Sequence, residues 1–158
     1  GLTGLTNRRQ AELRLKEEAA IVRRHNLSVC LALLDLDHFK SINDTYGHAA
    51  GDQVLQETAS RLLGAIRQED LLARYGGEEF LLILRHTALG GAQLLIERLL
   101  LTISERPFQL ADGRELKLSL SAGLTLFQPD DELEQALQRA DQALYRAKES
   151  GRNRFCLA

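Results

Sequence analysis

Apolar positions along the chain follow two periods, one typical of strands and one typical of helices. Gly76 and Gly77 separate two apolar runs. Glycine accepts the positive φ values of the favoured two-residue hairpin turns, so a tight hairpin is expected there. Asp112–Gly113 is a second hairpin signal. The strands expected from these runs cover residues 28–35, 71–75, 79–85, 108–111, 115–127 and 155–157.

Helical spacing of the remaining apolar residues predicts five helices. Thr6 is a candidate cap for the first of them, and Gly51–Asp52 is the candidate start of the third. Helices then alternate with strands and hairpins, which predicts a mixed sheet covered by helices in one α+β domain over residues 1–158. The expected helices cover about residues 6–25, 39–46, 51–66, 92–104 and 132–148.

Composition narrows the class of protein. The 158 residues are 44% hydrophobic and 27% charged, which suits one globular domain with a sizeable core. A net charge of −2 provides no broad basic field, so a nucleic-acid partner is not expected. Cys30 and Cys156 lack the spacing of a zinc site or a disulfide framework, which favours reduced thiols.

The hydropathy of the chain and its first residue lead to expectations about location and about the longer parent protein. No apolar run approaches the roughly 20 residues of a membrane helix, and no signal peptide is present, so we expect a cytoplasmic domain without membrane contact of its own. A parent chain anchored in a membrane is compatible with this. The first residue is Gly1 rather than methionine, which suggests a fragment with a regulatory domain upstream.

Two acidic elements stand at predicted strand ends. Asp35, Leu36 and Asp37 end the first long strand, and Glu78 and Glu79 follow the glycine turn. Strand alternation is expected to place the two glutamates on opposite surfaces, and the one on the packed side then needs a cation or a hydrogen-bond partner. If the first strand lies beside the hairpin, Asp35, the Leu36 carbonyl and Glu78 converge as oxygen ligands for divalent ions that bridge a nucleoside triphosphate. A solvated turn and an exposed strand pair are the ordinary alternatives.

Further polar residues suit a nucleotide. Lys40 is placed to reach a phosphate, and Asn43 with Asp52 offers acceptors for the adjacent N–H donors of guanine, which adenine lacks. The ordinary alternatives are a turn cap for Asn43 and a helix cap for Asp52. Lys148 and Arg152, near a helix end, either clamp phosphates or complement the helix dipole.

Together these residues resemble the GGDEF domains, the diguanylate cyclases of bacterial signalling, over essentially the whole chain. Gly76-Gly77-Glu78-Glu79-Phe80 is the signature of that family in its GGEEF form. The other matching motifs are Leu2-Thr3-Gly4-Leu5-Thr6-Asn7-Arg8-Arg9, Asp35-Leu36-Asp37-His38-Phe39-Lys40 with Asn43-Asp44, Gly47-His48 with Gly51-Asp52, and Tyr145-Arg146-Ala147-Lys148 with Gly151-Arg152-Asn153.

The resemblance implies a fold and a reaction. The fold would be a ferredoxin-like βαββαβ core with added helices and a hairpin, related to nucleotide cyclases and to the polymerase palm. The reaction would convert two GTP into cyclic di-GMP and two pyrophosphates, with two Mg²⁺ or Mn²⁺ ions per active site. The residues implied are Asp35, the Leu36 carbonyl and Glu78 for the metals, Glu78 also for deprotonation of the 3′-hydroxyl, Asn43 and Asp52 for guanine, Lys40, Lys148 and Arg152 for phosphates, and His48 near the nucleotide.

The same resemblance implies partners and regulation. One domain binds one GTP, so two domains would have to face each other as a homodimer. Arg67 and Asp70, which alone would suggest only a polar loop, match the inhibitory product site of the family and imply feedback by cyclic di-GMP. Asp52 differs in relatives that make mixed dinucleotides, and its presence favours GTP. The aspartate that precedes the Leu-Thr-Gly-Leu motif in the family is absent, since Gly1 is the first residue.

Two other hypotheses stay open. One is a catalytically silent GGDEF domain that acts as a receptor for cyclic di-GMP or GTP, and the other is a bare protein-interaction domain. The complete set of acidic, base-reading and phosphate-binding residues favours the cyclase over both.

Overall fold

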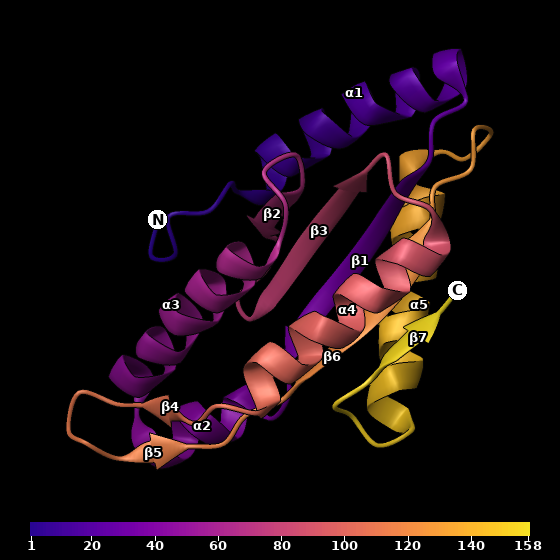
Figure 1. Ribbon diagram of the computed structural model, residues 1–158. Helices are drawn as coiled ribbons and strands as arrows, with labels where there is room; N and C mark the ends of the chain where they lie inside the picture. Colours follow the sequence, from indigo (N-terminus) through magenta and orange to yellow (C-terminus); the bar gives the residue numbers. More distant parts are fainter.

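Five strands form the central sheet of the computed structural model, which describes residues 1–158 (Figure 1). The spatial order of the strands is β2-β3-β1-β6-β7, and β4 and β5 pair separately as a small two-stranded sheet. The strands are β1 (Val29–Leu36), β2 (Leu71–Arg74), β3 (Glu79–Arg85), β4 (Phe108–Gln109), β5 (Glu115–Leu116), β6 (Leu120–Leu126) and β7 (Phe155–Leu157). The helices are α1 (Arg8–His25), α2 (Phe39–Tyr46), α3 (His48–Ala65), α4 (Leu89–Ser104) and α5 (Leu133–Glu149).

The topology confirms the expected fold class. Strands β1, β2, β3 and β6 pair antiparallel in the order 2-3-1-6, with α2 and α3 between β1 and β2 and α4 between β3 and β6. This is the ferredoxin-like βαββαβ arrangement. The additions are α1, α5, the β4–β5 hairpin and β7, which pairs parallel with β6 and makes the sheet mixed.

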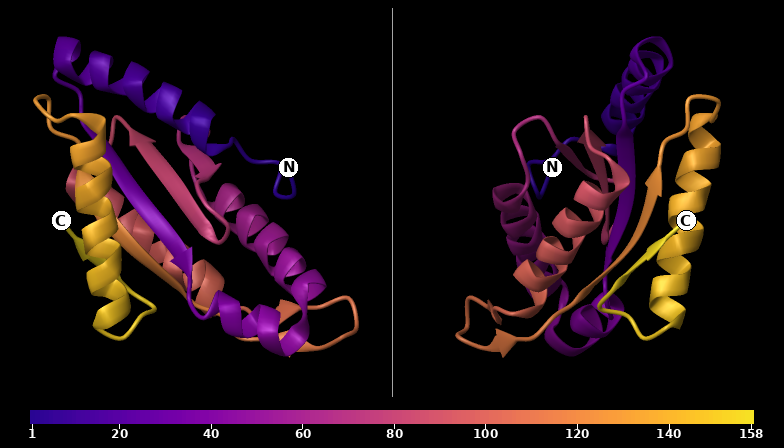
Figure 2. Two further views of the ribbon diagram at one scale, coloured as in Figure 1. Left: turned by 180° about the vertical axis from the view of Figure 1, so that it is seen from behind. Right: turned by 45° about the vertical axis from the view of Figure 1, so that its right-hand side comes forward.

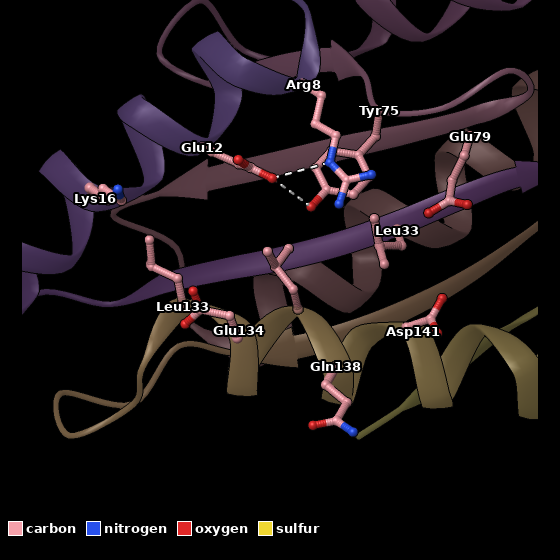
Figure 3. Close-up of a pocket in the computed structure, with 11 residues that line it drawn as sticks. Arg8, Glu12, Lys16, Leu33, Tyr75, Glu79, Leu133, Glu134, Gln138 and Asp141 are labelled. Carbon is pink, nitrogen blue, oxygen red and sulfur yellow. Dashed lines mark hydrogen bonds and ion pairs between the residues drawn. The ribbon is translucent and has the colours of Figure 1, made fainter.

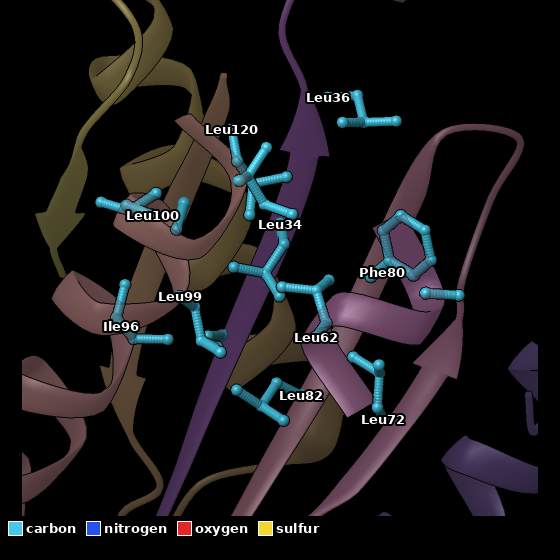
Figure 4. Packing of buried hydrophobic residues seen from close by; sticks show 14 of the residues in the cluster. Leu34, Leu36, Leu62, Leu72, Phe80, Leu82, Ile96, Leu99, Leu100 and Leu120 are labelled. Atoms are coloured by element: carbon cyan, nitrogen blue, oxygen red, sulfur yellow. The ribbon is translucent and has the colours of Figure 1, made fainter. Parts of the chain in front are cut away.

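Helices cover both faces of the sheet, so alternate residues of the central strand enter two separate cores. Even-numbered residues of β1 such as Leu34 and Leu36 join the larger core under α3 and α4 (Figure 4). Odd-numbered residues such as Leu31 and Leu33 join a smaller core under α1 and α5. Figure 2 shows α5 on the other side of the sheet from α3 and α4. Because β1 is buried along its whole length, its apolar run shows no polar alternation.

The element boundaries differ from the predicted ones at three places. The cap of α1 is Asn7, whose side chain accepts from the Gln10 amide at 2.9 Å, while Thr6 pairs with Ala73 of β2. Helix α3 begins at His48 and not at Gly51–Asp52. The predicted strand 115–127 is two strands, β5 and β6, and only β5 belongs to the second hairpin.

The hairpin between β2 and β3 is confirmed, but its turn is not the predicted one. Neither Gly76 nor Gly77 has a positive φ. Residues 75–78 form a wider loop in which the amides of Tyr75 and Gly76 both donate to the Glu79 carbonyl, at 2.8 and 3.1 Å. A β-carbon on Gly77 would meet no atom within 4 Å. The glycines therefore leave open space beside the loop, and the turn does not require their conformational freedom.

Helix α5 lies close against β6 at Gly123. A β-carbon there would overlap the Ala140 carbonyl oxygen and the Leu144 amide nitrogen, both in the backbone of α5. We therefore expect Gly123→Ala to lower the free energy of unfolding by about 2–3 kcal/mol, because backbone cannot give way as a side-chain tip can.

Gly64→Ala is the matched control, because a β-carbon at Gly64 of α3 meets nothing within 4 Å. It is expected to change stability by less than about 1 kcal/mol, in the stabilising direction. Urea unfolding of both variants measures the difference. Equal stability of the two would show that α5 does not depend on close contact at Gly123.

None of the helices is long and apolar enough to cross a membrane.

Candidate functional site

Asp35 lies one residue before the end of β1, opposite Glu79 at the start of β3. Its side chain is buried on the face covered by α5, and Oδ2 accepts from Lys148 Nζ of α5 at 2.8 Å. Oδ1 has no hydrogen-bond partner. An unpaired oxygen on a buried carboxylate is costly, so this atom is suited to a partner that the chain does not supply.

Glu78 lies in the loop just before β3, within reach of Asp35. Burial raises the pKa of the Glu78 carboxyl to about 7, and its neighbour Asp35 adds to the rise. Lys148 opposes the rise, but its ammonium is already paired with Asp35. A carboxyl group buried beside a second carboxylate forms a site that favours a cation.

Glu79 lies on the same side as Asp35 and does not point away from the cluster. Burial raises the pKa of the Glu79 carboxyl, with further contributions from Asp35 and from Asp141 of α5. Glu79 borders a cavity between α1 and α5, whereas Glu78 lines a cavity beside α2 and α3, which agrees with the predicted placement of the two glutamates on opposite surfaces. Both carboxyl groups nevertheless lie near Asp35.

The donor set fits a hard divalent cation. Asp35 and Glu78 offer carboxylate oxygens, one of them unpaired, and Lys148 places its positive charge on Asp35. The Leu36 amide donates to the Glu78 carbonyl at 3.4 Å, so the predicted ligand residues of β1 and the loop are directly linked. No three His, Cys, Asp or Glu side chains are grouped to hold an ion. A bound ion would thus need oxygens from a ligand or from water, as Mg²⁺ at phosphates usually has.

A cavity of about 410 Å³ extends from Glu78 toward α2 and α3. Four of the residues predicted from sequence line it together with Glu78. The Asn43 amide, which lines this cavity, packs so closely on Gly51 that a β-carbon on Gly51 would overlap Asn43 Oδ1. That oxygen is buried without a partner. The lining residues are Phe39, Lys40, Asn43, His48, Asp52, Leu55, Arg74, Gly77 and Glu78.

Asp52 is not a helix cap. Helix α3 is preceded by Gly47, with no side-chain cap, and Asp52 lies in its second turn with the carboxylate at the cavity. The alternative of an ordinary capping role is thereby removed for Asp52. Lys40 and Arg152 make no hydrogen bond or ion pair within the chain through their charged groups, so both are free for an anion.

Arg67 and Asp70 lie apart from this cavity. The Arg67 guanidinium donates to Asp70 at 2.9 Å, to the Arg85 carbonyl at 3.0 Å, and to the Thr87 hydroxyl. Arg85 ends β3, whereas Glu79 begins it. The two residues are thus held together, at the opposite end of β3 from the carboxylate pair.

A second cavity, of about 490 Å³, lies between α1 and α5 (Figure 3). The Arg8 guanidinium stacks over the Tyr75 ring at 4.4 Å, and the Tyr75 hydroxyl donates to Glu12 at 3.2 Å. Sequence reasoning did not assign Tyr75 a role. The position of Tyr75 directly before Gly76 could have indicated a role near the glycine loop. Its contacts with Arg8 and Glu12 attach α1 to that loop.

Asp37 was grouped with Asp35 from sequence, but the structure separates them. The Asp37 carboxylate is buried and accepts from the hydroxyls of Ser119 and Ser121, both at 2.6 Å, and from the Asn153 amide at 3.0 Å. Asp37 therefore has its partners within the chain, while Asp35 lacks one. The spacing Ser119-x-Ser121, which puts two hydroxyls on one face of a strand, was a signal for this contact.

Comparisons with known proteins agree with the motifs. The chain matches the family model described as diguanylate cyclase, GGDEF domain, over residues 1–154. It is 46% identical over 157 residues to diguanylate cyclase DgcP of Pseudomonas aeruginosa, covering 99% of this chain and 23% of that protein. It is 45% identical over 157 residues to the response regulator PleD of Caulobacter vibrioides, covering 96% of this chain and 34% of that protein. The chain thus spans about a quarter to a third of the length of these relatives.

Solved structures are similar in fold over the whole chain. Diguanylate cyclase SiaD of Pseudomonas aeruginosa, in complex with its activator SiaC, has a TM-score of 0.96 and 41% sequence identity, covering 99% of this chain and 60% of that one. The coiled coil and GGDEF domain of DgcB from Caulobacter crescentus, in complex with c-di-GMP, has a TM-score of 0.96 and 34% identity, covering 100% of this chain and 84% of that one.

Proposed function

Because the chain belongs to the GGDEF domain family of diguanylate cyclases, we propose that it condenses two GTP into cyclic di-GMP and two pyrophosphates. The observation that carries the proposal is that Glu78, which lies beside Asp35, lines the same cavity as Asn43 and Asp52. Acidic ligands for a cation and acceptors for a guanine edge thus share one site. Two buried oxygens there, Asp35 Oδ1 and Asn43 Oδ1, lack partners in the free chain.

In this proposal Asp35, the Leu36 carbonyl and Glu78 hold two divalent ions, Mg²⁺ or Mn²⁺. When bound, such ions stabilise the negative charge on the triphosphate and on the departing pyrophosphate. Glu78 has a carboxyl pKa near 7 and also accepts a proton, which suits it to assist removal of the proton from the 3′-hydroxyl. Lys148, which is paired with Asp35 in the free chain, would hold a phosphate if the Asp35 carboxylate held a metal ion.

The remaining cavity residues orient the nucleotide. Asn43 and Asp52 accept from the guanine edge, and adenine would leave the Asp52 carboxylate unpaired. Lys40 and Arg152, whose charges are free, hold phosphates with Lys148, and His48 lies at the edge of the nucleotide. The open space beside Gly77 admits the ligand.

The proposed reaction requires a second copy of the domain, because its two nucleotides must face each other. One cavity holds one GTP, and each 3′-hydroxyl must attack the α-phosphorus of the other nucleotide as pyrophosphate leaves. Two copies of the domain therefore face each other, and their proximity supplies a large part of the rate. We include in the proposal a cytoplasmic location for this domain and a regulatory domain elsewhere in a longer parent chain, the latter supported by the greater length of the relatives.

Incubation of the purified domain with GTP and Mg²⁺, with chromatographic detection of products, tests the proposal. The expected result is cyclic di-GMP, formed at a rate per chain that rises with protein concentration because two chains must meet. Absence of product at high protein concentration, with binding of cyclic di-GMP or GTP retained, would instead establish the alternative of a silent receptor.

Gly51→Ala is expected to weaken binding of a nonhydrolysable GTP analogue about tenfold while leaving the fold intact. The added methyl group overlaps Asn43 Oδ1, so the flexible amide has to move from its position in the cavity. Calorimetry of the analogue measures the loss. The control is Gly64→Ala, on the same helix but outside the cavity. Unchanged affinity in Gly51→Ala would count against contact between Asn43 and guanine.

Arg67→Ala is expected to relieve inhibition by cyclic di-GMP, raising the inhibitory concentration at least about tenfold, because a charged hydrogen-bond donor is lost from a product site. Arg67 is already oriented by Asp70 and the Arg85 carbonyl, so little order is lost on binding. Assays with added cyclic di-GMP measure the change. Identical inhibition of the variant and the wild-type chain would remove Arg67 and Asp70 from the inhibitory site.

A further inference from the structure

Asp37 lies just beyond β1, where it joins three separate parts of the chain. Its amide donates to the Ser119 carbonyl at 3.0 Å, which extends the pairing of β1 with β6 by one residue. Its Oδ1 accepts from Ser121, and its Oδ2 accepts from Ser119 and from the Asn153 amide. The side chain is only 4% exposed and forms no ion pair, so these three donors are its partners.

The third donor belongs to a loop with an unusual backbone. Gly151, Arg152 and Asn153 have φ values of 128°, 63° and 49°, a run of three left-handed residues after α5. This region disfavours residues with a β-carbon, although asparagine tolerates it better than most. Such a loop persists only where its surroundings hold it. The anchors are the Arg152 amide on the Ala147 carbonyl, at 3.0 Å, and the Asn153 amide on Asp37.

The loop places Arg152 between these two anchors. The Arg152 guanidinium makes no hydrogen bond or ion pair within the chain, so the loop backbone decides where this side chain begins. Lys148, one turn earlier, reaches Asp35 at 2.8 Å. The end of β1 thus contacts Lys148 directly through the Asp35 carboxylate, and the residue after β1 contacts the loop of Arg152 through the Asp37 carboxylate.

We propose that Asp37 is a positioning residue that directs the Arg152 guanidinium toward the nucleotide phosphates by holding the Asn153 amide. The inference rests on the proposed function, which supplies the role of Arg152. The inference also gives the two aspartates different roles, since Asp35 has an unpaired oxygen and Asp37 has three hydrogen-bond partners. Asp37 then acts on nucleotide binding, while Asp35 acts on the metal.

The test is a double-mutant cycle on binding of a nonhydrolysable GTP analogue with Mg²⁺. Arg152→Ala and Asp37→Ala are each expected to weaken binding about tenfold, and the double variant also about tenfold rather than about a hundredfold. Asp37→Asn should bind within about threefold of the wild-type chain, because one amide oxygen can still accept from Asn153 and Ser119. The matched control is Asp130→Ala at an exposed aspartate.

Amide hydrogen exchange gives a readout that needs no nucleotide. In Asp37→Ala the Asn153 amide is expected to exchange at least about tenfold faster, while the amides of β1 and β3 keep their protection. Thermal unfolding confirms that the variant is folded. If Asp37→Ala does not fold, the comparison is made with Ser119→Ala and Ser121→Ala together, which remove the two hydroxyls that orient the carboxylate.

Two outcomes would overturn the inference. One is an additive double variant, which would show that Asp37 acts apart from Arg152. The other is an Asp37→Asn variant that needs far more Mg²⁺ than the wild-type chain, which would make Asp37 a metal ligand. A wild-type chain that binds the analogue but forms no cyclic di-GMP would refute the proposed function alone, because both the cycle and the exchange rates remain measurable.

Discussion

Asp35→Ala is expected to lower the rate of cyclic di-GMP formation by about a thousandfold or more, since metal stabilisation of phosphoryl charge is worth several kcal/mol. The substitution removes the carboxylate on which Glu78 and Lys148 converge. Glu78→Ala removes the other carboxylate and should have an effect of the same order. The measurement is the initial rate at saturating GTP and Mg²⁺, at a protein concentration that keeps two domains in contact.

The controls separate chemistry from folding. Asp130→Ala removes an exposed aspartate from the loop before α5 and should keep the full rate. Circular dichroism and thermal unfolding should show that Asp35→Ala stays folded, because Lys148 is 30% exposed and can turn to water when its partner is lost. A wild-type rate in either Asp35→Ala or Glu78→Ala would remove that residue from the metal site.

The rate is also expected to rise with pH through about 7, falling about fiftyfold between pH 7 and pH 5. Burial and the Asp35 carboxylate raise the pKa of Glu78 to about 7, so at lower pH the carboxyl is protonated and cannot hold a cation. Metal and proton compete for the same oxygens, so higher Mg²⁺ should shift the profile to lower pH. A pH–rate profile at two Mg²⁺ concentrations measures both effects.

Without divalent ions, the free energy of unfolding should fall as pH rises, whereas the reaction rate should increase. The folded chain keeps the Glu78 proton up to about pH 7, whereas the unfolded chain releases it near pH 4.5. This contribution is therefore fully present below about pH 4.5 and is lost as pH rises through 7. The wild-type chain should lose about 1 kcal/mol of unfolding free energy between pH 5 and pH 8, and Glu78→Gln should not show this loss. The value is modest because the Glu78 carboxyl is partly solvated. Parallel profiles for the two proteins would refute the assigned cause.

Sequence reasoning predicted which candidate site residues lie together where residue type and strand order determine their position. Asp35 and Glu78 were predicted to lie close together because the end of one strand was expected beside the start of its neighbour. In the structure β1 ends beside the start of β3, and the two side chains are neighbours. The apolar runs predicted the α+β class, since burial imposes the period of each element, whereas the division into two cores was not predicted. Asn43 and Asp52 were paired by the shape of a guanine edge, and they share one cavity.

Other features depend on packing that no local pattern contains. Gly51 was expected to start a helix, but it lies inside α3, where its missing side chain makes room for Asn43. The turn at Gly76 and Gly77 was expected to need positive φ, but a wider loop removes that need. The role of Asp37 depends on the register between β1 and β6, which brings Ser119 and Ser121 beside it.

The most direct test of the shared cation site is a crystal of the domain grown with Mn²⁺ and a nonhydrolysable GTP analogue, in which anomalous scattering locates the metal. We predict Mn²⁺ between the Asp35 and Glu78 carboxylates, within ligand distance of both, with Lys148 moved from Asp35 to a phosphate. Manganese bound only to the phosphates, with the Lys148–Asp35 ion pair still closed, would contradict the account.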